Sequence, residues 1–330
     1  MAEGRTPIAE SENVLIAAGE CDITVLPRFG GKISSMRIGP NELLQPPLSQ
    51  IAPRTNTMSF DKGDASGWDE CLPSVGACAV ETEAGVSDIP DHGDLWRVEW
   101  ERLGRGNGDS VENTLNLVGK CFSLPLELQR TIHLNETERG WRLDLKYRVR
   151  NTGDYPVPWS WTAHPLFACE EGDRIVLPES IRLLKLEGSG GNRLGKNGDS
   201  VTWPMADLAD GTTADLSVAD RADSGIGDKL FTGLLSKNEN WCALERISIG
   251  LRIRVRFDPA ATPYLGLWIC YGGWPERPGP KQVCIAMEPS TAPVDSLAVR
   301  GTWSRELGAG KSFSWPMQVE IERIERQANA

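Results

Sequence analysis

The chain has 330 residues, of which 40% are hydrophobic and 25% are charged, and its formal net charge is −11. This composition is typical of a soluble globular protein, and the length suffices for one large all-β domain or two medium domains. The acidic excess argues against nucleic acid and against an anionic membrane as partners, because negative charge repels phosphate groups at long range. A neutral polar ligand fits this charge balance better.

Eight cysteines are scattered along the chain, mostly inside apolar runs, and no C-x-x-C pair occurs. This spacing predicts small buried side chains in a reducing compartment rather than a disulfide framework or a zinc site. The first residues carry no apolar segment behind a basic start, and no apolar run is long enough to cross a membrane. We therefore expect a cytoplasmic protein.

Strand patterns begin after residues 1–12, which we expect to form a disordered lead-in. Apolar segments at residues 14–17 and 23–26 predict a hairpin, and residues 33–38 predict a third strand. Residues 39–67 are rich in Pro, Asn, Ser and Gly and predict a long ordered loop. Long loops in compact domains are often functional.

Three later segments alternate apolar and polar residues with the period of a half-buried strand. They are residues 141–150, 247–257 and 313–321. No convincing amphipathic helix, heptad pattern or internal repeat accompanies them. The chain order therefore predicts an all-β fold, a large antiparallel β-sandwich that forms a single domain over residues 13–325, with a short tail at 326–330.

The stretch from Cys284 to Leu297 places one carboxylate, Glu288, at the end of an apolar run and then breaks at Pro289 into a turn. The run predicts a buried strand, although periodicity alone does not separate such a strand from a helical segment. A carboxylate partly removed from water has a raised pKa and suits a base or acid near neutral pH. The alternative is a solvated or salt-bridged glutamate at the rim of a strand, which is the common case for this residue type.

The three histidines lie in different settings. His92 lies in a Pro/Gly-rich loop before a predicted strand at residues 96–100, and His164 lies in an aromatic strand that Pro165 interrupts. A proline inside a strand pattern predicts an edge strand or a bulge. The alternative is a structural role for both, with His92 bonded to a neighbouring aspartate and His164 capping the bulge. His133 lies on a plain strand and receives no role, and the absence of H-x-H and H-E-x-x-H patterns argues against a metal site.

Tryptophan is over-used, with 12 copies against four tyrosines. An indole ring stacks on the C–H face of a sugar and offers one N–H donor, so tryptophans beside Asp and Glu suit a pyranose. The alternative is that they fill a large sandwich core. Six lie near the segments described above: Trp68, Trp96, Trp159, Trp161, Trp268 and Trp274.

Six short motifs, taken in order, resemble those of the aldose 1-epimerase (galactose mutarotase) family, in its divergent branch. They are LPRFGGKI at 26–33, GWDECLP at 67–73, PDHGDLW at 90–96, HPLF at 164–167, DKLF at 228–231 and MEP at 287–289. Each is weak alone, but their common order makes the resemblance fairly specific. It implies a supersandwich of antiparallel sheets with an open sugar-binding cleft, and no cofactor, because proton transfer is the whole reaction.

By this resemblance, Glu288 is the base that takes the proton of the anomeric hydroxyl. His164 is the acid that protonates the ring oxygen, and His92 is a second imidazole that binds or helps to protonate it. The three side chains would have to converge on one concave surface. The residues expected to contact the sugar come from the same motifs and from the tryptophans: Trp68, Asp69, Glu70, Asp94, Trp96, Asp228, Lys229 and Trp268.

The sequence departs from the family at residues 67–70, where galactose mutarotases carry an Asn-Arg type motif close to the sugar. The spacing between Pro73 and His92 is similar to that of hexose-6-phosphate epimerase-like members, but a phosphate site needs a cluster of cations. The candidate cations are Arg54, Arg97 and Lys229. We therefore expect an unphosphorylated monosaccharide as the substrate. The alternatives are a hexose-6-phosphate 1-epimerase and a non-catalytic sugar-binding protein on the same fold, and the sequence leaves open whether the chain is a monomer or a homodimer.

Overall fold

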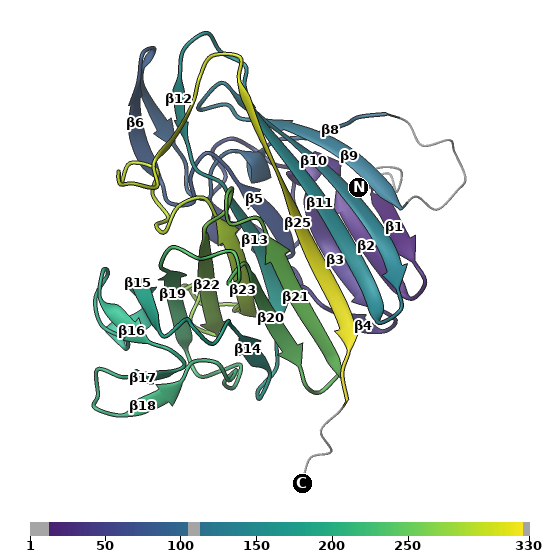
Figure 1. The fold of residues 1–330 in the computed structure, drawn as a ribbon, viewed down its shortest axis with the longest axis vertical. Coiled ribbons are helices and arrows are strands. Elements are labelled where there is room, and N and C mark those ends of the chain that lie inside the picture. The colour runs from purple at the N-terminus through teal and green to yellow at the C-terminus, as the bar shows by residue number, and fades with distance from the viewer. Residues whose placement is uncertain (1–12, 105–112, 326–330) are drawn as a thin grey trace, which may run out of the picture.

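The computed structural model of the chain describes residues 13–104 and 113–325. Two large antiparallel sheets pack face to face, and three two-stranded ribbons accompany them (Figure 1). The predicted all-β antiparallel sandwich is thereby confirmed. The lead-in expected at residues 1–12 and the tail expected at 326–330 lie outside the described residues.

The larger sheet has eleven strands, in the order β1-β2-β3-β5-β13-β23-β22-β19-β15-β16, and β4 pairs with β3. Its strands are β1 (Val14–Ala18), β2 (Cys21–Leu26), β3 (Lys32–Ile38), β4 (Asn41–Glu42), β5 (Trp68–Cys71), β13 (Thr162–Ala168), β15 (Leu183–Ser189), β16 (Ser200–Thr202), β19 (Ile226–Thr232), β22 (Tyr264–Tyr271) and β23 (Val283–Ser290).

The smaller sheet has eight strands, in the order β14-β20-β21-β25-β11-β10-β9-β8. Its strands are β8 (Glu101–Arg102), β9 (Thr114–Lys120), β10 (Leu126–Thr137), β11 (Gly140–Asn151), β14 (Arg174–Val176), β20 (Trp241–Arg246), β21 (Leu251–Phe257) and β25 (Ser312–Arg323).

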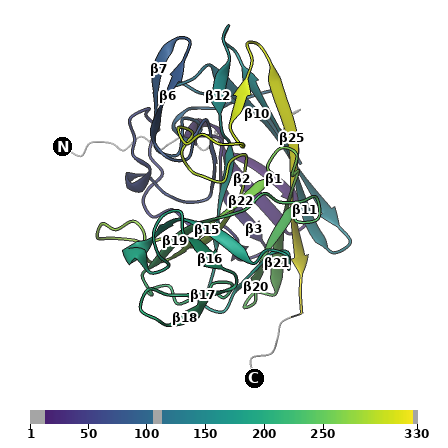
Figure 2. The same ribbon diagram turned by 60° about the vertical axis from the view of Figure 1, so that its left-hand side comes forward.

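The ribbons are short and lie toward the ends of the molecule. They are β6 (Cys78–Thr82) with β7 (Gly85–Ile89), β12 (Val157–Trp159) with β24 (Arg305–Leu307), and β17 (Met205–Asp207) with β18 (Thr213–Asp215). Figure 2 shows β6 and β7 at one end of the long axis and β17 and β18 at the other. The described residues also form 3-10 helices η2 (Pro27–Phe29), η3 (Phe60–Lys62), η4 (Leu95–Arg97) and η5 (Gly190–Asn192). Among these residues, no helix has the length and apolar character to span a bilayer.

The two sheets share one hydrophobic cluster. It includes Leu143 and Val255 from the smaller sheet and Ile23 and Leu267 from the larger one. Burial of these side chains supplies the main driving force for packing the sheets together. Because successive side chains of a strand point to opposite faces, the larger sheet has a second face that looks away from this core.

Several predicted elements agree with the structure and two do not. The hairpin of β1 and β2 and the strand β3 are confirmed, and the predicted loop at 39–67 contains only β4 and η3. The strand predicted at 96–100 is wrong, because this segment begins with the 3-10 helix η4. The strand predicted at 247–257 is wrong at its start, because β20 and β21 meet in a turn that closes at Gly250, whose φ is +67°.

Strand β13 lies inside the larger sheet, between β5 and β23, and not at the edge that Pro165 predicts. The pairing of β13 with β23 has partners at Thr162 and then from Leu166 onward. The interval around Pro165 therefore needs no N–H donor toward β23, which removes the usual objection to a proline in a central strand.

The cysteines agree with the interpretation of their spacing. All eight are free, and six of them are buried.

Candidate active site

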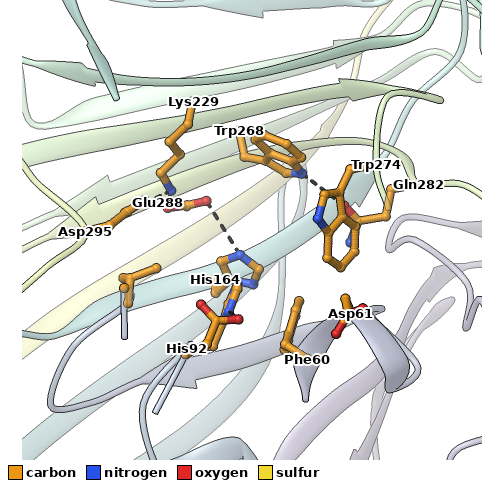
Figure 3. Close-up of a pocket in the computed structure, with 13 residues that line it drawn as sticks. Phe60, Asp61, His92, His164, Lys229, Trp268, Trp274, Gln282, Glu288 and Asp295 are labelled. Carbon is orange, nitrogen blue, oxygen red and sulfur yellow. Dashed lines mark hydrogen bonds and ion pairs between the residues drawn. The ribbon is translucent and has the colours of Figure 1, made fainter. Parts of the chain in front are cut away.

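A pocket of about 360 Å³ opens on the face of the larger sheet that looks away from the smaller sheet (Figure 3). This volume suits a small ligand such as a monosaccharide. Four neighbouring strands, β13, β23, β22 and β19, contribute one lining side chain each: His164, Glu288, Trp268 and Lys229. The connecting segments contribute the rest: Phe60, Asp61, Val75, Gly76, Asp91, His92, Trp274, Gln282 and Asp295.

The register of two strands brings His164 and Glu288 together. In the antiparallel pairing of β13 with β23, Leu166 lies opposite Ala286, and continuing this register by two residues sets His164 across from Glu288. Nε2 of His164 lies 3.8 Å from Oε1 of Glu288. Both side chains are almost completely buried, with exposed fractions of 5% and 0%.

The carboxylate of Glu288 is held on one side only. Nζ of Lys229 donates a hydrogen bond to Oε2, whereas Oε1 has no hydrogen-bond partner among the described residues. Nζ of Lys229 also lies 3.6 Å from Oδ1 of Asp295. Burial raises the pKa of Glu288, and the ammonium of Lys229 acts in the opposite direction.

Lys229 itself is firmly cationic. Burial acts against its charge, but the carboxylates of Asp295 and Glu288 outweigh that effect and raise the pKa of the ammonium above its usual value. The pocket thus contains a buried ammonium between two carboxylates.

His164 is a neutral imidazole in this setting. Burial holds its pKa well below the usual value, and the positive charges of His92 and Lys229 lower it further. Its Nδ1 is buried and finds no hydrogen-bond partner within residues 13–104 and 113–325. Its ring therefore retains unused hydrogen-bonding capacity inside the pocket.

His92 is held by its neighbours from two sides. Its Nδ1 lies 2.9 Å from Oδ2 of Asp91, and its ring stacks on Phe60 with 3.7 Å between the ring centroids. The ring centroid lies 5.1 Å from that of His164. The contact with Asp91 occupies Nδ1 and leaves Nε2 as the nitrogen for another partner.

The backbone at His92 is also unusual. Its φ is +60°, a left-handed conformation that residues with a Cβ adopt at a cost, and its N–H donates to the carbonyl of Val75. The contact with His92 also affects Asp91. Burial acts to raise the pKa of its carboxyl, but the hydrogen bond from His92 contributes to a net lowering of that pKa. The chain thus accepts local strain to hold this imidazole at the pocket.

Aromatic side chains form another part of the pocket wall. The indole of Trp268 donates from Nε1 to Oε1 of Gln282 over 3.0 Å, and Trp274 lies 6.1 Å from Phe60 between ring centroids. Figure 3 shows these two indoles on one side, apart from Lys229 and Asp295. Aromatic faces opposite polar groups match the two kinds of surface that a sugar ring presents.

Comparison with known proteins shows which family this chain resembles. The model of the aldose 1-epimerase family matches residues 77–191, a segment that includes both pocket histidines. The resemblance to the aldose 1-epimerase family is confirmed. No curated protein sequence matches the chain.

Solved structures with the galactose mutarotase-like fold are similar to the chain over nearly their whole length. The Slr1438 protein from Synechocystis sp. PCC 6803 is 17% identical, with 98% of this chain and 100% of that chain covered and a TM-score of 0.70. A putative aldose 1-epimerase from Escherichia coli K12 is 17% identical, with coverages of 94% and 99% and a TM-score of 0.67. A galactose mutarotase-like protein from Lactobacillus casei ATCC 334 is 16% identical, with coverages of 94% and 100% and a TM-score of 0.64. At these identities the likeness shows the fold.

The structure brings five of the predicted site residues into the pocket and leaves six outside its lining. The five are Glu288, His164, His92, Lys229 and Trp268. The six are Trp68, Asp69, Glu70, Asp94, Trp96 and Asp228, which have structural contacts instead.

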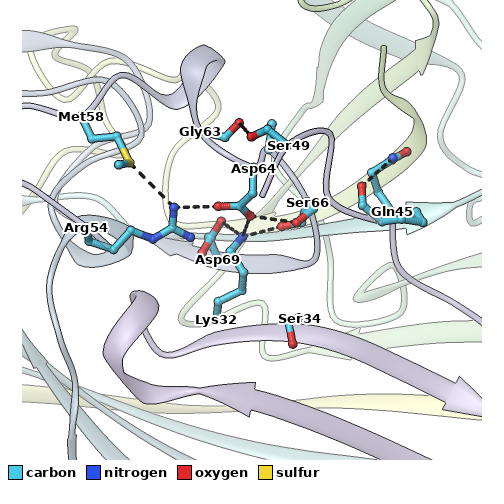
Figure 4. Close-up of polar contacts among 12 residues, drawn as sticks. Lys32, Ser34, Gln45, Ser49, Arg54, Met58, Gly63, Asp64, Ser66 and Asp69 are labelled. Carbon is cyan, nitrogen blue, oxygen red and sulfur yellow. Dashed lines mark hydrogen bonds and ion pairs between the residues drawn. The ribbon is translucent and has the colours of Figure 1, made fainter. Parts of the chain in front are cut away.

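Three of these six come from β5, which contains the central residues of the GWDECLP stretch at 67–73. Trp68 and Glu70 point into the core between the sheets, because they alternate with Asp69 along the strand. Asp69 lies opposite His164 in the register, but it is buried beside Lys32. Figure 4 shows how Lys32 joins Asp69 to Asp64, so that these side chains fasten the loop at 39–67 to the sheet.

Asp94 and Trp96 have structural contacts outside the pocket lining. Oδ2 of Asp94 accepts hydrogen bonds from the backbone N–H and the hydroxyl of Ser123, which holds the turn before β10. Trp96 is 1% exposed and packs edge-on against Phe60, with 5.2 Å between ring centroids. Phe60 thereby separates Trp96 from the pocket that it was expected to line.

Asp228 lies on the opposite face of β19 from Lys229, because the two are neighbours along one strand. It accepts a hydrogen bond of 2.8 Å from Nε of Arg193, which fastens the segment after β15. Phe231 lies on the same face of β19 as Lys229, with its ring below the ammonium, but Lys229 is the residue of the DKLF motif that lines the pocket.

The charges around the pocket do not form a phosphate site. Arg54 pairs with Asp64, and Arg97 donates to the backbone carbonyls of Met58 and Gly93, away from the pocket lining. Of the described residues that line the pocket, Lys229 alone carries an ammonium or guanidinium, against four carboxylates: Asp61, Asp91, Glu288 and Asp295. Within the same described part of the chain, no three His, Cys, Asp or Glu side chains are grouped to hold a metal ion.

Some lining residues were not predicted from the sequence. Asp91 directly precedes His92, and Asp295 belongs to the stretch from Cys284 to Leu297 that contains Glu288, so both lie in segments that the sequence had singled out. Phe60, Asp61 and Gln282 reach the pocket from loops, and no local pattern marks them. The expectation that the loop at 39–67 has a functional part is consistent with Phe60 and Asp61 lining the pocket.

Proposed function

We propose that this protein is an aldose 1-epimerase that interconverts the α and β anomers of an unphosphorylated aldose. The observation that carries the proposal is the unpartnered Oε1 of the buried Glu288, which faces the imidazole of His164 at 3.8 Å. The resemblance to the aldose 1-epimerase family supports the same reaction class.

The reaction begins when Oε1 of Glu288 takes the proton of the anomeric hydroxyl. The electrons of that O–H bond form the C1 carbonyl, and the bond between C1 and the ring oxygen breaks with its electron pair on the ring oxygen. That oxygen gains a proton from an imidazole. Rotation about the C1–C2 bond and reversal of both proton transfers close the ring with either configuration at C1, and each group returns to its starting state.

The two imidazoles have different roles at the ring oxygen: one donates a hydrogen bond to it and the other protonates it. Because burial keeps His164 neutral, it meets the ring oxygen as a hydrogen-bond donor. We assign the proton to His92, because the contact of its Nδ1 with Oδ2 of Asp91 at 2.9 Å orients the ring and leaves Nε2 to meet the ring oxygen. This division differs from the one that the family resemblance implies, in which His164 is the acid.

The charge of the pocket supports an unphosphorylated substrate. Four carboxylates against one ammonium repel a phosphate group, and the ammonium of Lys229 is already paired with Glu288 and Asp295. The aromatic rings of Trp268 and Trp274 supply apolar contact for the C–H face of the sugar. We also propose a cytoplasmic location, which the eight free cysteines support.

Polarimetry of freshly dissolved aldoses tests the proposal. The wild-type protein should accelerate mutarotation of at least one unphosphorylated aldose. Glu288→Gln should lower the rate about 10² to 10⁴ fold, the usual size of general acid–base effects. His133→Ala is the matched control, because His133 lies on β10, outside the pocket lining, and this variant should keep full activity.

Two outcomes would contradict the proposal. Sugar binding without any acceleration would indicate a non-catalytic sugar-binding protein. Acceleration restricted to hexose 6-phosphates would indicate a phosphate-specific epimerase, and the assignment of an unphosphorylated substrate would be wrong.

A further inference from the structure

Three charged side chains form a chain at one end of the pocket, in the order Glu288, Lys229, Asp295 (Figure 3). The first two are almost fully buried, at 0% and 8% exposed, and the side chain of Asp295 is 23% exposed. An ammonium buried between two carboxylates is costly to desolvate and is kept only where both partners satisfy it. These two ion pairs therefore constrain the position of Glu288.

The sheet is built to allow this contact. Lys229 lies on β19 and Glu288 on β23, with β22 between them, so the lysine side chain must reach across one strand. The residue opposite Glu288 on β22 is Gly266. A Cβ built at Gly266 would come within 3.0 Å of Oε2 of Glu288, the oxygen that Lys229 binds. The missing side chain thus leaves room for the ion pair.

We infer that Lys229 and Asp295 are positioning residues for Glu288, an inference that rests on the proposed function. The ammonium binds Oε2 and fixes the plane of the carboxylate, so that Oε1 is the one oxygen left to receive the proton of the substrate. Asp295 holds the ammonium in place from the other side. Neither residue exchanges a proton with the sugar.

The two residues have opposite electrostatic effects on the base. The positive charge of Lys229 lowers the pKa of Glu288, whereas the negative charge of Asp295 raises it. A buried carboxyl without the lysine would hold its proton at neutral pH and could not accept another. The aspartate prevents the lysine from making the carboxylate too weak a base.

Six titratable groups of the described residues face Glu288 from the packed elements. Lys229 of β19 and Asp295 of the segment after β23 flank it, and His92 lies on the loop before η4. The neutral imidazole of His164 lies on β13, and the thiols of Cys71 and Cys284 lie on β5 and on β23 itself. Replacing Lys229 or Asp295 leaves the imidazoles and Glu288 in place.

The test compares Lys229→Met, Lys229→Arg and Asp295→Asn in two measurements. The first is the pH profile of kcat/KM for mutarotation of a freshly dissolved aldose such as α-D-glucose or α-D-galactose. The second is the titration of the Glu288 carboxyl without substrate, by 13C NMR of protein labelled at glutamate Cδ. The Glu288 signal is assigned by its loss in Glu288→Gln.

We expect the two removals to move the titration in opposite directions. Glu288 must be ionised to act, so activity falls as the pH drops through its pKa. Lys229→Met should move this acidic fall in activity to higher pH. At pH values below it, kcat/KM should then be lower than that of the wild type by about tenfold for every pH unit of the shift. Asp295→Asn should move the acidic fall to lower pH, and Lys229→Arg should restore most of the wild-type profile.

Lys185→Met is the matched control, because Lys185 is an exposed residue of the neighbouring strand β15, outside the pocket lining, and its loss should leave both profiles unchanged. The inference would be overturned if the titration of Glu288 were unchanged in Lys229→Met. It would also be overturned if Lys229→Met and Asp295→Asn moved that titration in the same direction. A rise in KM with an unchanged pH profile would mean that Lys229 binds sugar directly. If the wild-type protein accelerates no aldose, the proposed function fails, while the substrate-free titration still decides whether Lys229 and Asp295 control Glu288.

Discussion

At the scale of single residues, the pocket collects polar atoms that lack partners. Oε1 of Glu288 and Nδ1 of His164 are buried and make no hydrogen bond with any described residue. An unsatisfied buried polar group costs about 1–3 kcal/mol, and proteins normally avoid it. Two such atoms in one pocket are available for hydrogen bonds to a ligand, and a sugar carries hydroxyl groups that could supply them.

The pairing of Asp91 with His92 leads to a prediction at the same scale. Asp91→Asn puts a neutral amide in place of the carboxylate that contacts Nδ1 of His92 and orients its ring, and it should lower kcat about 10 to 10² fold, within the range of general acid catalysis. KM should change little, because the ring stays stacked on Phe60. Polarimetry at neutral pH measures the effect, with Asp88→Asn on the exposed strand β7 as the control.

The opposite result would be informative about the imidazoles. If Asp91→Asn retains full kcat while His164→Gln loses activity, the proton comes from His164, as the family resemblance implies, and the role given to His92 is wrong.

The sequence predicted the residues with distinctive chemistry better than their partners. Glu288 and His92, which line the pocket, were singled out because a carboxylate ends an apolar run and a histidine lies in a Pro/Gly-rich motif. Asp69, in contrast, has the same local character as a site residue, but Lys32, 37 positions earlier, neutralises it. Such pairing depends on contacts between distant segments, which no local pattern contains.

At the scale of elements, the site exists because four strands from distant parts of the chain are neighbours. The order β13-β23-β22-β19 sets His164, Glu288, Trp268 and Lys229 on one face. Alternation along each strand was predictable from the sequence, since it follows from the period of two. The order of the strands and their register were not, because long-range pairing in the sandwich sets both, and so the adjacency of His164 and Glu288 could only be implied by the family resemblance.

Gly266 on β22 gives a prediction about this arrangement. A Cβ at this position would lie 3.0 Å from both Oε2 of Glu288 and Cε1 of Phe231, so Gly266→Ala must displace the carboxylate or the ring. We expect kcat to fall about tenfold or more, because small displacements of a catalytic group have large effects on rate. The melting temperature and polarimetric rate of the variant would be measured together.

Gly188→Ala on β15 provides the comparison, because a Cβ there would meet no atom within 4 Å. Both variants add one methyl group to a strand of the same sheet. Equal activity in the two would show that the position of Glu288 tolerates displacement, contrary to the expectation.

At the scale of the whole molecule, one buried carboxyl links the two sheets. Glu70 of the larger sheet accepts hydrogen bonds from Arg130 and Tyr147 of the smaller sheet, at 2.9 Å and 3.0 Å, and from the indole of Trp161 at 3.0 Å. Burial raises the pKa of Glu70 to about 7, although Arg130 and the hydrogen bonds act in the opposite direction. The carboxyl therefore titrates inside the core, close to neutral pH.

This raised pKa makes the stability of the fold depend on pH in a definite direction. The folded protein keeps the Glu70 proton up to about pH 7, whereas the unfolded chain loses it near pH 4.5. Between these values the folded state binds more protons, so the free energy of unfolding falls as the pH rises, by about 3 kcal/mol from this group, and stays at the lower level above the window.

Glu70→Gln has no carboxyl to titrate and should lose this part of the pH dependence, even if its stability is lower throughout because Arg130 loses its ionic partner. Urea unfolding at about pH 5 and about pH 7.5 measures how the free energy of unfolding changes with pH in the wild type and in Glu70→Gln. Glu101→Gln, at the exposed strand β8, is the control and should keep the wild-type pH dependence. Parallel slopes for wild type and Glu70→Gln would mean that Glu70 is ionised throughout this range and joins the two sheets as a permanent ion pair with Arg130.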